Sequence, residues 1–342
     1  MIIRSLIPLL FLLLAADTPS RAGDRLFYPG KDGPGKGRHL VLVAGDEEYR
    51  SEEALPMLAG ILAERHGFDC TVLFAQDPKT GVIDPNNQTY IPGLEALDHA
   101  DMLILFTRFR DLPDSAMKPI ADFVNSGKPI LGIRTATHAF AIGAEKPSAY
   151  ARYDWRSKEW PGGFGQQVLG ETWIAHHGSH GKESTRGLIN PVQAHHPILK
   201  GVKALWGPTD VYRVIHLPEN ALVLVYGQVL EGMHPNDEPV KGPKNDPMMP
   251  LIWVRGYTGD SGKTSRIICS TMGAAVDLES EGLRRLFVNA CYWGLGLESQ
   301  IPNESDVRYV RDYDPTFFGF NKFKQGLKPS DFESPAPKAP SQ

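Results

Sequence analysis

Through residues 39–133, short apolar runs alternate with segments whose apolar residues recur at helical spacing. Runs that are apolar at every position are typical of strands buried on both faces of a sheet. The predicted strands are 39–43, 70–74, 102–106 and 129–133. The segments between them predict helices, one with Glu52 and Glu53 in its first turn and one that begins at Asp114 and ends before Gly127. We therefore predict an α/β fold with a doubly wound, mostly parallel sheet covered by helices on both faces.

The second half of the chain has a different pattern. Two stretches, 150–165 and 176–181, are rich in glycine and in aromatic or charged residues and predict long loops. Four later runs predict strands, at Val211–His216, Leu222–Tyr226, Leu251–Val254 and Ile267–Ser270. A stripe of apolar residues from Leu283 to Trp293 predicts a closing helix. We assign residues 38–297 to one α/β domain.

Aromatic residues crowd the segment that follows this domain. Residues 298–328 contain six Tyr and Phe residues, and we expect this C-terminal extension to pack back on the domain. Residues 329–342 are rich in proline, serine and alanine, a composition typical of disordered tails.

The first 22 residues have the pattern of an export signal. Arg4 supplies a positive charge, residues 6–16 form an apolar run, and Ser20 and Ala22 are the small residues that a signal peptidase reads. The run is shorter than the roughly 20 residues that a membrane-spanning helix needs. We predict a secreted or periplasmic protein, cleaved near Ala22, with no membrane partner after cleavage. A membrane anchor is the alternative.

Charge and cysteine content narrow the class of protein. The formal net charge of -4 provides no basic field for nucleic acid. Cys70, Cys269 and Cys291 lie in apolar segments, so we predict buried thiols rather than a disulfide framework.

Gly262-Lys263-Thr264 resembles part of a phosphate loop but lacks the earlier glycine, and we predict no cofactor. The oligomeric state, including a homo-oligomer, is left open.

Polar residues gather just after three of the predicted strands. In an open parallel sheet, ligands bind outside the carboxyl ends of the strands. Acids, arginines and a histidine together can hydrogen-bond a polyhydroxyl ligand or a carboxylate, and they can exchange protons. A solvated rim of ion pairs is the plainer alternative. The residues are Asp46, Glu47 and Tyr49 after the first strand, Arg108 after the third, and Arg134, Thr135 and His138 after the fourth.

The segment 131–138 has the strand-to-turn pattern of a nucleophile elbow. In an active elbow the turn carries Ser or Cys, whereas this chain has Arg134, which cannot act as a nucleophile. Acyl transfer by this elbow is therefore excluded. His138 follows one helical turn later and is expected on the same face as Arg134.

Three histidines lie close together at positions 176, 177 and 180. Adjacent histidines in an extended segment point to opposite faces, and no H-E-x-x-H pattern accompanies them. We therefore predict that one of them, His177 first, contacts substrate, and that the site holds no metal. Metal binding by this cluster is the alternative.

Several short motifs occur in a specific order: Gly45-Asp46 after the first strand, Gly132-Ile133-Arg134-Thr135, His176-His177-Gly178, Asp210-Val211-Tyr212 and Thr271-Met272-Gly273. In this order the chain resembles the trehalose-utilisation (ThuA-like) family, a branch of the class I glutamine-amidotransferase-like fold, over about residues 38–297. The resemblance implies a flavodoxin-like sheet, loss of the glutaminase cysteine and a role in carbohydrate metabolism, including oxidised (keto) glycosides. The signal and aromatic extension suggest the exported bacterial subgroup. The family is expected to have a histidine at the position of Ala274. Because this loop lacks that base, His138 and His177 become the main histidine candidates for acid–base chemistry.

Three functions are open. The first is an exported enzyme that acts on a disaccharide or keto-glycoside by acid–base chemistry without a covalent nucleophile. In it Glu47 is the acid or base, Arg134 and Arg108 stabilise negative charge, and His138 or His177 relays protons. The second is a non-catalytic sugar-binding or scaffold protein, and the third is a metal-dependent hydrolase. The other predicted sugar contacts are Asp46, Tyr49, Thr135, Trp160, which is placed to stack on a sugar ring, His176 and Asp210.

Overall fold

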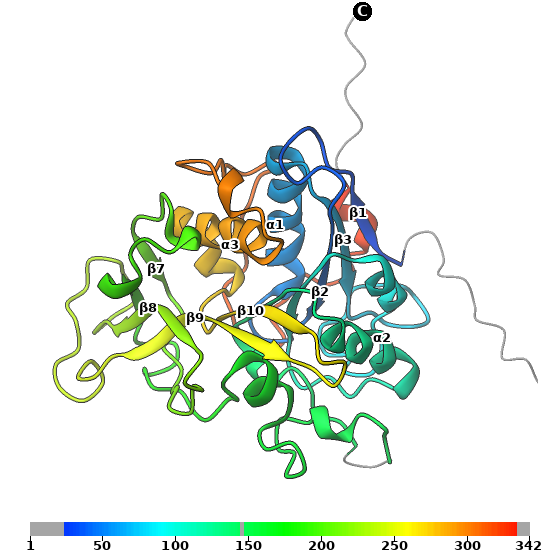
Figure 1. The fold of residues 1–342 in the computed structure, drawn as a ribbon, viewed down its shortest axis with the longest axis horizontal. Coiled ribbons are helices and arrows are strands. Elements are labelled where there is room, and N and C mark those ends of the chain that lie inside the picture. Colours follow the sequence, from blue (N-terminus) through cyan, green and yellow to red (C-terminus); the bar gives the residue numbers. More distant parts are fainter. Residues whose placement is uncertain (1–23, 144–146, 334–342) are drawn as a thin grey trace, which may run out of the picture.

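The computed structural model describes residues 24–143 and 147–333, and one ten-stranded sheet runs through its centre (Figure 1). The predicted export signal lies outside the described residues. In chain order the strands are β1 (Leu26–Tyr28), β2 (His39–Gly45), β3 (Asp69–Phe74), β4 (Met102–Thr107), β5 (Ile130–Ile133), β6 (Thr185–Ile189), β7 (Leu205–Gly207), β8 (Leu222–Val229), β9 (Met249–Thr258) and β10 (Thr264–Ser270). In the sheet their order is β1-β3-β2-β4-β5-β10-β9-β8-β6-β7.

Five inner strands of the sheet, β3, β2, β4, β5 and β10, run parallel to their neighbours within this group. The four apolar runs that predicted strands in the first half coincide with β2, β3, β4 and β5, and nearly all of their residues are buried. Gly45 at the end of β2 pairs with Thr107 at the end of β4, so these strands finish at a common edge. The molecule therefore has an α/β fold with a large sheet whose inner strands are mostly parallel.

The other half of the sheet is antiparallel and consists of β9, β8, β6 and β7. Strands β8, β9 and β10 confirm three of the four strands predicted in the second half, but the strand predicted over Val211–His216 is wrong. In that segment Tyr212 forms only an isolated bridge with His176, and the Val211 carbonyl accepts a hydrogen bond from the His177 N–H at 2.8 Å. The segment is apolar because it packs under the loop that carries the histidines, and it does not join the sheet.

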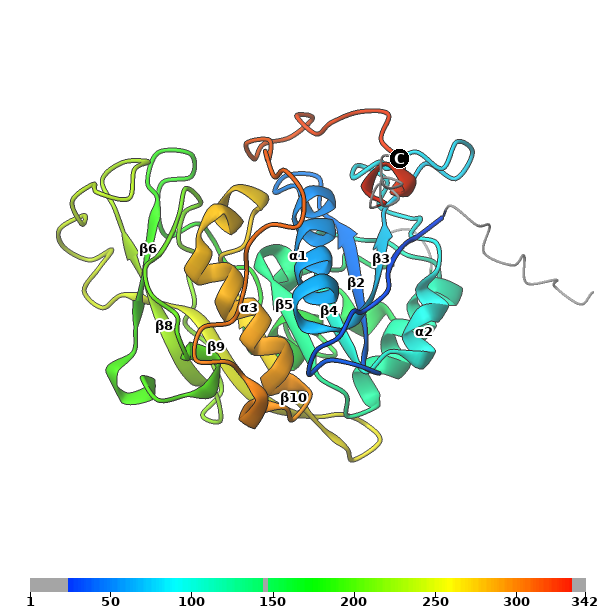
Figure 2. The same cartoon turned by 90° about the horizontal axis from the view of Figure 1, so that it is seen from above.

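Among the described residues, three α-helices cover the sheet: α1 (Ser51–His66), α2 (Asp114–Asn125) and α3 (Glu281–Gly294). Helices α1 and α3 pack with Leu42 and Ile104 in one hydrophobic cluster, whereas α2 packs with Val43 and Leu105 in another. Successive residues of a strand point to opposite faces, so β2 and β4 contribute to both clusters. Figure 2 shows α1 and α3 along one face of the parallel strands.

Short turns of 3₁₀ helix, and one π-helical turn at η4, connect these elements. Cys70, Cys269 and Cys291 are buried free thiols, as predicted. Across residues 24–143 and 147–333, no helix is both long enough and apolar enough to cross a membrane. The short turns are η1 (Leu94–His99), η2 (Arg134–His138), η3 (Ala151–Tyr153), η4 (Gly165–Leu169), η5 (Pro191–Gln193), η6 (Pro197–Leu199), η7 (Ala275–Glu279), η8 (Glu298–Gln300) and η9 (Pro329–Phe332).

The C-terminal extension runs back across α1, where Phe318 is buried in the same cluster as the helix and Tyr313 packs against it (Figure 2). The tail was expected to be disordered from residue 329, but Pro329–Phe332 form the turn η9. The reason is that Phe332 has partners: its ring stacks on Phe74 with centroids 5.9 Å apart, and its carbonyl accepts a hydrogen bond from the Tyr28 hydroxyl. Residues 334–342 of the predicted disordered tail lie outside the described residues.

Candidate functional site

A cleft of about 230 Å³ lies at the carboxyl ends of the parallel strands. Five of its residues come from the segments that follow β2, β4 and β5, and the other four come from loops in the second half of the chain. The lining residues are Glu48, Tyr49, Arg108, Phe109, His138, Trp155, Trp173, His176 and Tyr212. The cleft therefore combines aromatic rings with groups that donate, accept or exchange protons.

Backbone strain marks the same edge of the sheet. Among the described residues, four that are not glycine have a positive φ, and three of them lie just after a parallel strand: Arg50 at 62°, Phe109 at 50° and Arg134 at 44°. The left-handed conformation costs an L-residue roughly 1–2 kcal/mol. Such strain persists only where the surrounding structure fixes it, and it clusters at functional sites.

Arg134 occupies the turn between β5 and η2, the position that the nucleophile has in an active elbow. Its side chain does not line the cleft but is fully buried beneath it. The guanidinium lies between the rings of Tyr49 and Tyr212, 4.1 and 4.4 Å from their centroids, and Nη1 donates to the Thr271 carbonyl at 2.7 Å. Because both tyrosines line the cleft, Arg134 supports its floor and places a positive charge under it.

Asp210 is buried beside Arg134 and connects it to two histidines. Arg134 Nη2 donates to Asp210 Oδ1 at 3.1 Å, His180 Nδ1 lies 3.1 Å from the same oxygen, and His176 Nδ1 lies 2.7 Å from Oδ2. Burial raises the pKa of Asp210, but the hydrogen bonds from the histidines and the charge of Arg134 outweigh it, so the pKa lies well below its usual value. Hydrogen bonds to Asp210 and Glu48 raise the pKa of His180 to about 9, against the effect of its burial.

The neighbouring acids Glu47 and Glu48 have different surroundings. Both oxygens of Glu47 are held by arginines, one by Arg108 and the other by Arg110 Nη2 at 2.6 Å, and Glu47 does not line the cleft. Glu48 lines the cleft, with Oε1 3.3 Å from His180 Nε2. Burial raises the pKa of Glu48, but the hydrogen bond to His180 and the charge of Arg108 bring it below its usual value. Glu48, rather than Glu47, is thus the carboxylate that a ligand would meet.

His138 lies on η2 at the wall of the cleft, whereas Arg134, which was expected on the same face, is buried beneath the cleft. The ring of His138 lies 4.9 Å from the Phe109 ring and 5.6 Å from the Trp173 ring, measured between centroids. Burial, followed by the charges of Arg108 and Arg134, holds the pKa of His138 well below its usual value. The imidazole is therefore neutral at pH 7, with one nitrogen that donates and one that accepts.

Asp46 and Thr135 connect two strand ends and do not line the cleft. Asp46 Oδ1 accepts hydrogen bonds from the backbone N–H groups of Glu48 at 2.7 Å and Tyr49 at 2.5 Å, and the Thr135 hydroxyl donates to Oδ2. Burial raises the pKa of Asp46 to about 6. This carboxyl group joins the loop after β2 to the elbow after β5 and so positions Glu48 and Tyr49.

Two predicted ligand contacts lie away from the cleft. His177 Nε2 is 2.9 Å from the Lys244 carbonyl oxygen, while its neighbour His176 faces the cleft on the opposite side of the segment. Trp160 packs against Tyr153, with ring centroids 5.3 Å apart. His180, a member of the predicted histidine cluster, adjoins the lining beside Glu48. The cleft residues that the sequence did not single out are Glu48, Phe109, Trp155, Trp173 and Tyr212. The only indication of these residues in the sequence is their position, because each lies within five residues of a predicted site residue.

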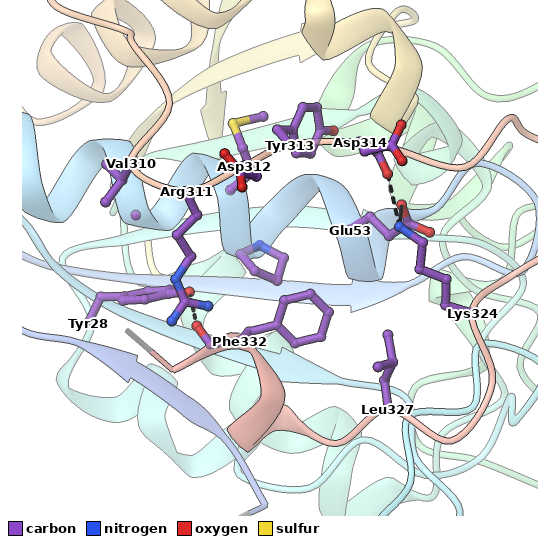
Figure 3. Close-up of a pocket in the computed structure, with 13 residues that line it drawn as sticks. Tyr28, Glu53, Val310, Arg311, Asp312, Tyr313, Asp314, Lys324, Leu327 and Phe332 are labelled. Atoms are coloured by element: carbon purple, nitrogen blue, oxygen red, sulfur yellow. Dashed lines mark hydrogen bonds and ion pairs between the residues drawn. The ribbon is translucent and has the colours of Figure 1, made fainter. Parts of the chain in front are cut away.

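A second cavity, of about 120 Å³, lies between α1 and the C-terminal extension (Figure 3). Its charged residues include Glu53 and Lys324, which pair with each other at 3.4 Å, and Arg311, whose guanidinium lies close to Tyr28 and Phe332. None of the described residues that line it is a histidine. Since the groups that exchange protons near neutral pH gather at the strand ends, the cleft there is the candidate functional site.

No protein-family model matches the sequence, and no curated protein matches it either. Among solved structures, the chain is similar to a candidate ThuA-like protein of Parabacteroides merdae, with 14% identity, 83% of this chain and 98% of that chain covered, and a TM-score of 0.50. A candidate ThuA-like protein of Bacteroides uniformis also has 14% identity, with 78% and 94% covered and a TM-score of 0.47. At this identity, the first likeness concerns the fold alone. The chain shares its fold with the ThuA-like protein of Parabacteroides merdae.

Proposed function

We propose that this chain is an exported member of the ThuA-like family that acts on a carbohydrate, a disaccharide or keto-glycoside, by acid–base chemistry without a covalent nucleophile. The ordered motifs of residues 38–297 and the fold shared with the Parabacteroides merdae protein support the family. The order of the parallel strands, β3-β2-β4-β5-β10, supports a flavodoxin-like arrangement, in which ligands bind at the carboxyl ends of the strands.

The observation that carries this proposal is the composition of the cleft. Tyr49, Phe109, Trp155, Trp173 and Tyr212 surround Glu48, Arg108, His138 and His176. A sugar ring has apolar C–H faces that pack on aromatic rings, and its hydroxyls need donors and acceptors at the edge of those rings. A cleft that offers both suits a sugar better than it suits a purely apolar ligand or a nucleotide.

The same geometry gives each polar group a chemical role. Glu48 is a carboxylate on the wall of the cleft and is suited to accept a proton from the ligand. His138 is neutral and can donate a proton to, or accept one from, a second oxygen. Arg108, with the buried charge of Arg134 below the floor, stabilises negative charge that develops on the sugar. In a keto-glycoside the carbonyl makes the adjacent C–H more acidic, so a carboxylate base beside cations fits this substrate class.

A non-catalytic sugar-binding protein is the second candidate. Two observations favour it: Arg134 occupies the nucleophile position, and Glu48 already pairs with His180 at 3.3 Å. A carboxylate held in this way can serve as a fixed hydrogen-bond acceptor for a hydroxyl group without taking its proton.

Turnover of a saccharide panel separates the two candidates. The mature protein is incubated with disaccharides and their keto forms, and products are identified by mass spectrometry. We expect product, and a loss of about 10²–10⁴-fold in kcat for Glu48→Gln. Glu47→Gln should lower the melting temperature, because it leaves Arg110 short of a partner, while turnover by the folded fraction stays within about tenfold. Saccharide binding without product supports the second candidate, and unchanged turnover in Glu48→Gln overturns the role given to Glu48.

A further inference from the structure

We propose that His176, His180 and Asp210 bind a divalent transition-metal ion such as Zn²⁺ at the wall of the cleft. Each residue offers one ligand atom, and these atoms all lie within 4.8 Å of one another. The proposal rests on the proposed function, since it places the ion where the sugar would bind. It departs from the prediction made from the sequence, which gave this site no metal.

The distances between the ligand atoms suit a small ion. His176 Nδ1 lies 2.7 Å from Asp210 Oδ2, and His180 Nδ1 lies 3.1 Å from Oδ1. In a tetrahedral site with bonds of about 2.0–2.1 Å, neighbouring ligand atoms are roughly 3.3 Å apart. Small side-chain rotations therefore bring the two imidazoles and one carboxylate oxygen around a common centre. Imidazole and carboxylate together suit zinc and its neighbours in the first transition row.

The groups around these residues are those expected of partners to metal ligands. Metal-binding histidines usually donate their second ring N–H to a carboxylate, and Glu48 Oε1 lies 3.3 Å from His180 Nε2. Ligating carboxylates are themselves hydrogen-bonded, and Arg134 Nη2 donates to Asp210 Oδ1 at 3.1 Å. Asp210 Oδ2 receives no hydrogen bond from Arg134, which leaves this oxygen for the ion.

The site is open on one side. Asp210 is buried, whereas the side chains of His176 and His180 are 36% and 33% exposed. His176 lines the cleft, so a fourth ligand would approach from there. Three protein ligands and an open position are typical of catalytic zinc sites and not of structural ones. The fourth position would take water or an oxygen of the sugar, which would place the substrate beside Glu48.

The neighbouring residue His177 provides a matched control variant. His177 adjoins His176 in sequence but faces the Lys244 carbonyl, 2.9 Å away, so His177→Gln removes an imidazole without touching the proposed ligands. The mature protein, purified without a histidine tag and freed of metal with a chelator, is titrated with Zn²⁺ by calorimetry. Co²⁺ is then added to record the visible absorption of its coordination sphere.

We expect wild type and His177→Gln to bind one equivalent of Zn²⁺ with similar affinity. His176→Gln and His180→Gln should each bind at least about 100-fold more weakly, with melting temperatures close to that of wild type. If one of these two variants fails to fold, the other decides, since each removes one of the two imidazole ligands. Intense visible bands of Co²⁺ in wild type indicate a tetrahedral site, and their loss in the folded variant assigns the ligand. Absence of stoichiometric binding in wild type, or equal binding by all variants, overturns the proposal.

Saccharide titrations of both the metal-free and the zinc-loaded protein keep this result separate from the proposed function. Saccharide binding without any Zn²⁺ binding means that the metal site fails and the carbohydrate function stands. Zn²⁺ binding without saccharide binding or turnover means that the metal site stands and the carbohydrate function fails.

Discussion

The parallel and antiparallel halves of the sheet supply the cleft in different ways. The parallel half contributes Glu48, Tyr49, Arg108, Phe109 and His138 from short segments directly after its strands, where left-handed turns and the Asp46–Thr135 hydrogen bond fix them. On the other side, Trp173, His176 and Tyr212 lie on two loops that pair with each other outside the strands. One half thus provides short turns directly after its strands, and the other provides longer loops with histidine and aromatic side chains. The buried pair of Arg134 and Asp210 joins them.

The largest effect is expected from breaking that junction. In Arg134→Met, Asp210 would remain buried without its arginine, and the Tyr49 and Tyr212 rings would lose the guanidinium between them. Removing one partner of a buried ion pair costs about 3–5 kcal/mol, so we expect a loss of that size in the free energy of unfolding. Denaturant titration followed by circular dichroism measures it.

The matched control is Arg152→Met, whose partner Asp260 is 66% exposed. An exposed pair contributes about 1 kcal/mol or less. If Arg134→Met loses no more stability than this control, the two halves are not joined through Arg134.

The two halves also differ in how well the sequence predicts them. Buried parallel strands are apolar at every position, so β2 to β5 could be located from the sequence alone. The outer strands β6 and β7 are short, and β6 is largely half-buried, so their residues resemble loop. Val211–His216 was mistaken for a strand because the same apolar pattern arises when a segment packs under a loop.

The location of the site followed from the strand ends, but the choice between adjacent residues did not. Glu47 and Glu48 are equivalent in sequence, and their roles separate only because Asp46 accepts the Glu48 N–H while Arg108 and Arg110 hold Glu47. Alternation predicts that His176 and His177 face opposite sides, but it does not say which side is the cleft. These assignments depend on tertiary contacts.

A change in the parallel half alone, Glu52→Gln, is expected to have an intermediate effect on stability. Glu52, in the first turn of α1, is buried, and neither carboxylate oxygen accepts a hydrogen bond from another residue. Burial raises its pKa from 4.5 to about 8. A carboxyl group whose pKa is raised by folding stabilises the folded state at low pH. This contribution to the free energy of unfolding is lost as the pH rises from the ordinary pKa of 4.5 through about 8. Glu52→Gln should therefore be more stable than wild type above pH 8, by about 1–3 kcal/mol, with a difference that shrinks toward pH 5.

Thermal unfolding of both proteins at a series of pH values measures this difference. Glu95→Gln, at a 58% exposed side chain, serves as the control and should show no such trend. A constant difference between wild type and Glu52→Gln from pH 5 to pH 9 would mean that Glu52 does not titrate with a raised pKa.

The smallest effect, on saccharide binding, is expected when two tryptophans of the second half of the chain are compared. Trp173 lines the cleft, whereas Trp160 packs against Tyr153 and Tyr257. Trp173→Phe should weaken saccharide binding by about tenfold, equivalent to about 1.4 kcal/mol, since it reduces the aromatic surface under the sugar. Trp160→Phe should leave the dissociation constant unchanged. Calorimetric titration with the tightest-binding saccharide checks both, and equal dissociation constants for the two variants would remove Trp173 from the site.

We expect the carbohydrate to bind in the cleft at the strand ends, which both halves of the sheet build. A crystal structure of the mature protein with its tightest-binding saccharide tests it most directly. We expect a sugar ring against Trp173, with hydroxyls within hydrogen-bond distance of Glu48 and His176. A saccharide bound instead in the cavity between α1 and the C-terminal extension, beside Glu53 and Arg311, would contradict it.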